Sequence, residues 1–114
     1  MAKQTSELSW EKRLLIISYK NEKDQIFTKT KKFISDNKCE IDDRNLEIIF
    51  FTKFKNKDFV TPDFIKNKFG IWLIGYDGEV KSFSLEEKFV NEIFYLIDQM
   101  PIRQQEMLMY KKKC

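Results

Sequence analysis

Apolar residues recur in two different rhythms along the first third of the chain. Residues 13–19 read Arg-Leu-Leu-Ile-Ile-Ser-Tyr, a nearly continuous apolar run of branched side chains that is typical of a strand covered on both faces. Asn21 and Asp24 then provide helix-start signals, and apolar residues repeat at helical spacing over 26–36. We therefore expect a core strand followed directly by an amphipathic helix.

A change of pattern after this helix predicts a loop and a second strand. Residues 36–45 are mostly polar and indicate a loop, whereas 46–51 return to an apolar run in which Glu47 is the one charged residue. Lysines at 53, 55 and 57 then alternate with other residues, which fits the end of that strand running out into solvent.

The second half of the chain contains strong turn and capping signals. Thr61-Pro62-Asp63 resembles a helix start, and the short helix that follows is expected to end at Gly70. Tyr76-Asp77-Gly78 lies between the strand-like runs 71–75 and 79–83, and Asp-Gly in that position predicts a β-hairpin.

A last helix is predicted after the hairpin. Ser84-Leu85-Glu86-Glu87 has the form of a capping box, and Pro101 is expected to end the helix. One wide apolar face is formed by Phe89, Val90, Ile93, Phe94, Leu96 and Ile97.

The element order is strand, helix, strand, short helix, two hairpin strands, helix. This order predicts one small α/β domain with a central mixed sheet of about four strands flanked by helices, the first two strands parallel and the last two antiparallel. It is the plan of a thioredoxin-like fold. We expect an N-terminal extension over 1–9, the domain over 10–108 and a lysine-rich tail over 109–114.

The composition excludes several classes of catalytic and metal site but does not identify a function. The 114 residues carry 21 basic and 18 acidic side chains, interspersed, for a net charge of +3. There is no histidine, which removes Ser-His and Cys-His nucleophile pairs and imidazole metal sites. The apolar runs are far shorter than the roughly 20 residues of a bilayer-spanning helix, so we expect no transmembrane segment. Residues 1–6 lack the apolar stretch of a signal peptide, which fits a cytosolic chain or a mature form.

The two cysteines do not form a recognisable motif. Cys39 and Cys114 have no partner two or three positions away, so neither a CxxC redox pair nor a zinc pair is present. A bridge between them is open from the sequence, but Cys114 is the last residue and follows three lysines. We expect two unpaired thiols, because such an end segment tends to fray.

Four motifs together resemble a known family. They are Trp10-Glu11-Lys12-Arg13, Asp43-Arg44-Asn45-Leu46, Ile74-Gly75-Tyr76-Asp77-Gly78-Glu79-Val80-Lys81 and Ile97-Asp98-Gln99-Met100-Pro101-Ile102-Arg103-Gln104-Gln105-Glu106-Met107. They resemble the P-DUDES family, a domain of unknown function in bacterial proteins that is similar to the repeated domain of the matrix protein coiled-coil domain-containing protein 80 and to domains of sushi-repeat proteins. Ile102 replaces the family's usual methionine. Tyr76 replaces a lysine in the turn, a change that we expect to be exposed and of little consequence for the fold.

The resemblance implies a thioredoxin-like or peroxiredoxin-like fold, a secreted or periplasmic location and a binding or adhesion-type function with a protein, matrix or glycan partner. Thioredoxin-like enzymes carry their nucleophilic cysteine after the first strand, at a helix N-terminus that lowers the thiol pKa. Here that loop, 20–26, has no cysteine, and Gly70 stands where such folds carry a cis-proline. We expect a non-catalytic domain without a cofactor. The alternative is a weak thiol-dependent oxidoreductase or peroxidase that uses Cys39.

One set of charged residues admits two interpretations. Its members are Arg13, Arg44, Lys81, Asp98, Arg103 and Glu106. They could form a polar groove for an acidic partner, with the arginines as bidentate donors. Alternatively, they are a structural latch, in which ion pairs pin the C-terminal segment against the sheet edge. The latch is the interpretation that the sequence favours.

Other binding functions are disfavoured. The lysines at 53, 55, 57, 66 and 68 lie near aromatic residues, but arginine is scarce and most of these aromatics fall at core positions, so nucleic-acid binding is not expected. Glu40, Asp42 and Asp43 lack the spacing and glycine turn of a calcium loop, so no metal site is predicted. No spacing singles out a carboxylate pair for glycoside hydrolysis. Because Glu79 and Lys81 would blunt pairing through the hairpin edge, we expect a monomer or a weak homodimer.

Overall fold

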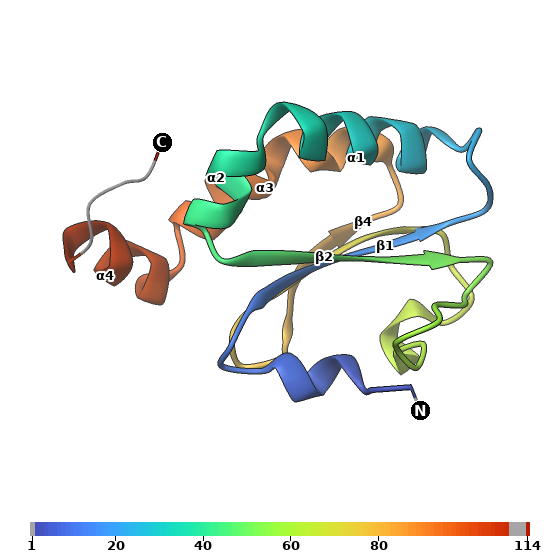
Figure 1. The fold of residues 1–114 in the computed structure, drawn as a ribbon, viewed down its shortest axis with the longest axis horizontal. Coiled ribbons are helices and arrows are strands. Elements are labelled where there is room, and N and C mark those ends of the chain that lie inside the picture. The colour runs from blue at the N-terminus through green and yellow to red at the C-terminus, as the bar shows by residue number, and fades with distance from the viewer. Residues whose placement is uncertain (1, 110–113) are drawn as a thin grey trace.

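The computed structural model describes residues 2–109 and 114, and it is a four-stranded mixed sheet between two layers (Figure 1). The strands are β1 (Arg13–Tyr19), β2 (Leu46–Thr52), β3 (Gly70–Ile74) and β4 (Val80–Ser84). Their order across the sheet is β2-β1-β3-β4, with β1 parallel to β2 and antiparallel to β3, and β3 antiparallel to β4. The predicted fold class is therefore confirmed, and the architecture is consistent with a thioredoxin-like fold.

Helices cover one face of the sheet and irregular structure covers the other. The α-helices are α1 (Gln25–Asp36), α2 (Lys38–Asp43), α3 (Ile93–Asp98) and α4 (Pro101–Met109), and the 3₁₀ helices are η1 (Thr5–Leu8), η2 (Asp63–Ile65) and η3 (Glu87–Glu92). In Figure 1, α1, α2 and α3 lie on one side of the sheet, η1 and the segment between β2 and β3 lie on the other, and α4 projects beyond one end.

Alternation along β1 divides the core between these two faces. Leu15 and Ile17 pack into the cluster on the helix side, together with Ile93 and Ile97. Leu14 and Ile16 pack into the opposite cluster, which contains Ile49, Phe51, Ile65, Trp72 and Ile74. All seven residues of β1 are buried, as expected for a central strand with cover on both sides.

Several predicted boundaries hold. Helix α1 begins at Gln25 with Asp24 as its N-cap, because the Asp24 carboxylate accepts a hydrogen bond from the Ile26 amide. The Asp77-Gly78 hairpin is present, and Gly78 has the positive φ of 83° that favours glycine.

Other local predictions are wrong. The polar stretch 36–45 contains α2, and the chain after β2 turns at Lys53 and Phe54, which have positive φ, instead of extending the strand. The short helix after Pro62 is the single 3₁₀ turn η2, and it ends at the left-handed Lys66 well before Gly70.

The last helix also differs from its prediction. Ser84 belongs to β4 and does not cap a helix, and the segment begins as the 3₁₀ helix η3 at Glu87. The helix does end before Pro101, because α3 stops at Asp98, but Pro101 also has a role that was not predicted. It is the first residue of α4, a position that proline favours because its missing N–H has no helical partner there.

No helix in the described ranges is long and apolar enough to cross a membrane.

Candidate functional site

Five of the six charged residues singled out in the sequence meet at one end of the sheet. Arg13 begins β1, Arg44 directly follows α2, Asp98 ends α3, and Arg103 and Glu106 lie on α4. All three arginines are buried, whereas Asp98 and Glu106 are partly exposed, so this end of the domain holds a network of ion pairs built around buried guanidinium groups. Lys81 lies apart on the hairpin, where its Nζ is 2.7 Å from Asp77 Oδ2.

Arg44 ties α2 to α3. Its Nε and Nη2 donate side-on to the two carboxylate oxygens of Asp98 at 3.0 and 2.9 Å, and its Nη1 donates to Glu40 Oε2 at 2.7 Å. The guanidinium also lies over the Phe94 ring, 4.2 Å from its centre. Burial by itself lowers the pKa of Arg44, but the hydrogen bonds to Asp98 and Glu40 outweigh it and raise that pKa above its usual value.

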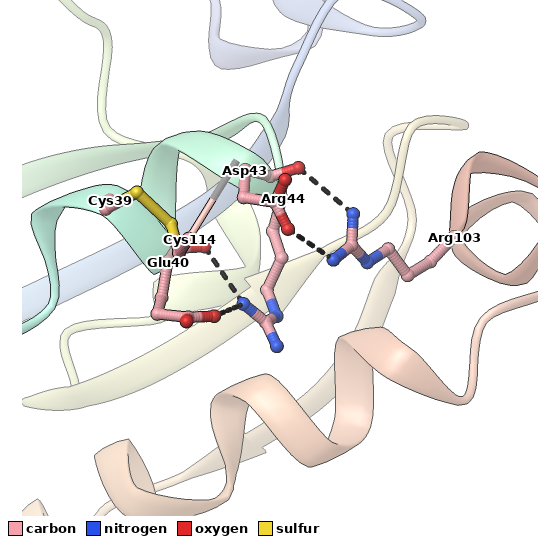
Figure 2. The surroundings of a disulfide bond; sticks show 6 residues. All are labelled: Cys39, Glu40, Asp43, Arg44, Arg103 and Cys114. Carbon is pink, nitrogen blue, oxygen red and sulfur yellow. Dashed lines mark hydrogen bonds and ion pairs between the residues drawn. A yellow bond between two sulfur atoms is a disulfide. The ribbon is translucent and has the colours of Figure 1, made fainter. Parts of the chain in front are cut away.

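Arg103 ties α4 to α2 and α3. Its Nη2 is 2.8 Å from Asp43 Oδ2, its Nη1 donates to the Asp43 carbonyl at 3.0 Å, and its Nε donates to Asp98 Oδ1 at 3.2 Å. Figure 2 shows Arg103 reaching across from α4 to Asp43. Burial opposes its charge, and the hydrogen bonds to Asp43 and Asp98 nevertheless raise the pKa of Arg103.

Arg13, the first residue of β1, belongs to the same network, but fewer of its donors have acceptors. Its Nη1 donates to the Arg44 carbonyl at 2.8 Å and to Glu106 Oε1 at 3.1 Å. The Tyr76 ring covers its guanidinium at 4.4 Å. Its Nε and Nη2 are buried with no hydrogen-bond partner among the residues that the structure describes.

Tyr76 connects the hairpin turn to this network. Its hydroxyl donates to Glu106 Oε2 at 3.1 Å and accepts from Asn45 Nδ2 at 3.0 Å. The expectation of an exposed turn residue is therefore wrong, because the ring lies over Arg13 and is partly buried. Burial raises the pKa of the Tyr76 hydroxyl.

Lys81 and Asp77 form a separate, exposed pair across the hairpin. The hydrogen bond from Lys81 lowers the pKa of Asp77, and the same bond raises the pKa of Lys81. Lys81 Nζ also approaches Glu79 at 3.7 Å. Such a surface pair contributes little to folding, so its interest is its position beside the cavity described next.

A cavity of about 340 Å³ lies between the hairpin and the junction of α3 with α4. Its walls are formed by Trp10, Arg13, Gly75, Tyr76, Asp77, Lys81, Met100, Pro101 and Ile102. A second cavity of about 250 Å³ shares Lys81, Met100 and Pro101 with it and continues along β4. Trp10 is 69% exposed. The cavity thus combines apolar walls with the edge of the charged network, which is the usual composition of a ligand pocket.

Cys39 and Cys114 form a disulfide, with their Cα atoms 5.9 Å apart, and the expectation of two unpaired thiols is wrong. The bridge joins α2 to the last residue of the chain and lies beside Glu40 and Arg44 (Figure 2). Fraying was the argument against pairing, but the bridge fixes Cys114 to α2, and Arg103 ties α4 to the same helix through Asp43. Both cysteines are solvent-exposed, and neither lies on the wall of the cavity.

Sequence reasoning missed four participants. Glu40, Asp43 and Asn45 bind the arginines or Tyr76, and Tyr76 itself covers Arg13. Three of them lie within the motifs that carried the family resemblance, and motif membership is the signal that could have identified them. In the described part of the chain, no group of three or more acidic or cysteine side chains is arranged to hold a metal ion.

Comparison with known proteins gives a family without a known activity. A family model described as a domain of unknown function, DUF4174, matches residues 4–106. The search of curated proteins finds no match. The search of solved structures finds no match either.

Proposed function

This chain belongs to the DUF4174 family of domains of unknown function, and on that premise we propose that it is a non-catalytic binding module that takes a protein partner in the cavity between the hairpin and the α3–α4 junction. The observation that carries the proposal is this 340 Å³ cavity, whose volume falls within the range of small ligand pockets. Trp10 stands exposed on its wall, and tryptophan is among the residues enriched at the energetic centres of interfaces.

The buried arginines support this assignment by acting as the frame of the cavity. Arg44 and Arg103 direct their donors at acids of the same chain, so they are poor candidates for recruiting an acidic partner. Instead they fix α4, whose first residues Pro101 and Ile102 form one wall. A wall held by charged hydrogen bonds is preorganised, which lowers the entropic cost of binding.

The disulfide supports a location outside the cytoplasm. Disulfides form and persist in oxidising compartments and are rare in the cytosol. We therefore assign the domain to a secreted or periplasmic protein, in line with the resemblance to the P-DUDES family and its matrix relatives. A partner in that compartment would be another secreted, matrix or envelope protein.

Peptide-library selection tests the binding function. The immobilised domain is panned against a displayed random peptide library, and the enriched peptides are measured in solution against two variants. Trp10→Ala removes the exposed ring from the cavity wall, whereas Tyr95→Ala removes a ring of similar exposure, 68%, from α3. We expect Trp10→Ala to abolish binding and Tyr95→Ala to preserve it. No enrichment, or equal binding by both variants, would overturn the proposal.

The exposed disulfide favours one second candidate, a thiol-dependent oxidoreductase. Exposed bridges are the ones that take part in redox chemistry, and reduction would free Cys39 as a nucleophile. To test whether Cys39 reacts with peroxide, we would compare peroxide consumption by the wild-type domain and by Cys39→Ser in the presence of dithiothreitol. Equal background rates end the oxidoreductase hypothesis, and a rate that depends on Cys39 would displace the binding module as the primary function.

A further inference from the structure

The three arginines of the network use their guanidinium edges differently. The Nε and Nη2 atoms of an arginine form a planar fork whose spacing matches the two oxygens of a carboxylate. Arg44 has this fork filled by Asp98, at 3.0 and 2.9 Å. Arg103 directs the same two atoms at Asp98 and Asp43. In Arg13 the fork has no partner in the described chain.

An empty fork on a buried guanidinium is an unusual feature. The Arg13 side chain is 0% exposed, and a buried donor without an acceptor costs free energy that a bound acceptor would recover. Its third nitrogen, Nη1, is already occupied by the Arg44 carbonyl and Glu106. An acceptor for Nε and Nη2 has to come from a ligand, and because each of these atoms has less than 1 Å² of accessible surface, the ligand must displace part of the wall around them.

Arg13 also forms part of the wall of the 340 Å³ cavity. Four charged groups lie on or next to this cavity: Arg13, Lys81, Asp77 and Glu106. Both acids have basic partners, since Asp77 pairs with Lys81 at 2.7 Å, and Glu106 pairs with Arg13 at 3.1 Å and Arg103 at 3.6 Å. The site is thus neutral without a ligand and leaves one positive fork with no acceptor.

We propose that the cavity binds a carboxylate carried on an apolar group, with the carboxylate on Nε and Nη2 of Arg13 and the apolar group against Trp10, Met100 and Ile102. The inference rests on the proposed function, because it identifies the chemistry that the same cavity recognises. Two sources offer this chemistry: the free C-terminus of a peptide that ends in an apolar residue, and a small organic acid.

Matched acids and amides test the carboxylate requirement. Isothermal titration calorimetry compares N-acetyl-phenylalanine with N-acetyl-phenylalaninamide, and an acetylated pentapeptide ending in phenylalanine with its C-terminal amide. We expect each acid to bind at least about tenfold more tightly than its amide, since the amide loses the charged, bidentate contact. A peptide acid much tighter than the single amino acid identifies a protein C-terminus as the source. Equal affinities identify a small acid, and they would overturn the protein partner of the proposed function while the carboxylate assignment stands.

Two variants locate the site. Arg13→Lys keeps the charge but removes the fork, and circular dichroism checks its fold. Ile102→Trp narrows the cavity, and Leu108→Trp, on an 82% exposed position of the same helix, is its matched control. We expect Arg13→Lys and Ile102→Trp to lose acid binding and Leu108→Trp to retain it.

The outcomes separate this inference from the proposed function. If panned peptides bind in a Trp10-dependent way but acid and amide bind equally, the carboxylate assignment fails while the binding module stands. If a structure solved with the acid shows only an ordered water on Nε and Nη2 of Arg13, the assignment also fails. If neither panned peptides nor acids bind, both proposals fail.

Discussion

Arg103 of α4 donates two hydrogen bonds to Asp43 of α2, one to the carboxylate at 2.8 Å and one to the backbone carbonyl at 3.0 Å. Both side chains are more than nine-tenths buried. The contact joins residues sixty positions apart in the sequence, so it fixes a C-terminal helix that otherwise has few apolar contacts of its own. This pair is the centre of the latch that holds one wall of the cavity.

Removing Arg103 should therefore weaken folding. We expect Arg103→Ala to lower the free energy of unfolding by about 3–5 kcal/mol, because it removes the guanidinium that pairs with the buried Asp43 carboxylate. Asp98 keeps both of its hydrogen bonds from Arg44. Urea unfolding followed by circular dichroism measures the change. Lys32→Ala, which breaks the exposed pair with Asp36, is the control and should change stability little. An unaffected melting temperature with loss of partner binding would favour the acidic-partner groove over the latch.

Loss of the disulfide should destabilise the domain to a similar degree. We expect Cys39→Ser to lower the free energy of unfolding by about 2–4 kcal/mol, because the bridge restrains the unfolded chain across a separation of 75 residues. Dithiothreitol should lower the melting temperature of the wild type to that of the variant and should leave the variant unchanged. A wild-type melting curve that is insensitive to the reductant would contradict the bridge.

Tyr76 should ionise at higher pH than an ordinary tyrosine. Burial raises its pKa above the usual value of 10.0, so the folded state favours the neutral phenol. Its contribution to stability is complete below pH 10 and is lost as the pH rises through the higher, folded-state pKa. Ultraviolet difference titration of the wild type against Tyr76→Phe isolates this group from the other three tyrosines. A Tyr76 component with an ordinary or lowered pKa would contradict its burial over Arg13.

Phe94 should matter for stability more than its neighbour Tyr95. The Phe94 ring packs 4.9 Å from the Phe33 ring and covers the Arg44 guanidinium, whereas Tyr95 is exposed. We expect Phe94→Ala to cost about 2–4 kcal/mol, slightly below a fully buried phenylalanine because its ring is only partly buried. Tyr95→Ala should cost little in the same denaturation experiment. Equal effects of the two substitutions would be inconsistent with this packing.

The sequence was most informative where one physical signal dominated. The continuous apolar run of β1 indicates a buried strand and the Asp77-Gly78 turn indicates a hairpin, and both were predicted. Prediction from the sequence failed where tertiary contacts override local preference. Helix α2 forms in a stretch that reads as a polar loop, because Ile41 is buried in the core and Arg44 is held by Glu40 and Asp98. No local pattern reports such contacts.

The site was predicted in its members but not in its geometry. The six charged residues were chosen because they lie in the four motifs, and five of them do meet in the structure. Their partners were not predictable, since pairing Arg103 with Asp43 depends on the path of α4 after Pro101, which was read as a helix end. The disulfide was missed for another reason: the end of the chain was expected to fray, and no local pattern pairs Cys114 with Cys39, which lies 75 positions away.

Nitrogen-15 labelling of arginine offers the most direct test of the account. The chain has three arginines, so the folded domain gives three Nε–Hε signals, assigned with single Arg→Lys variants. On addition of N-acetyl-phenylalanine we expect the Arg13 signal to shift while those of Arg44 and Arg103, already bound to Asp98, remain in place, and the amide should shift none. The account would be contradicted if the Arg13 signal did not shift on addition of the acid. It would also be contradicted if the signals of Arg44 and Arg103 shifted, because both side chains are already paired within the chain.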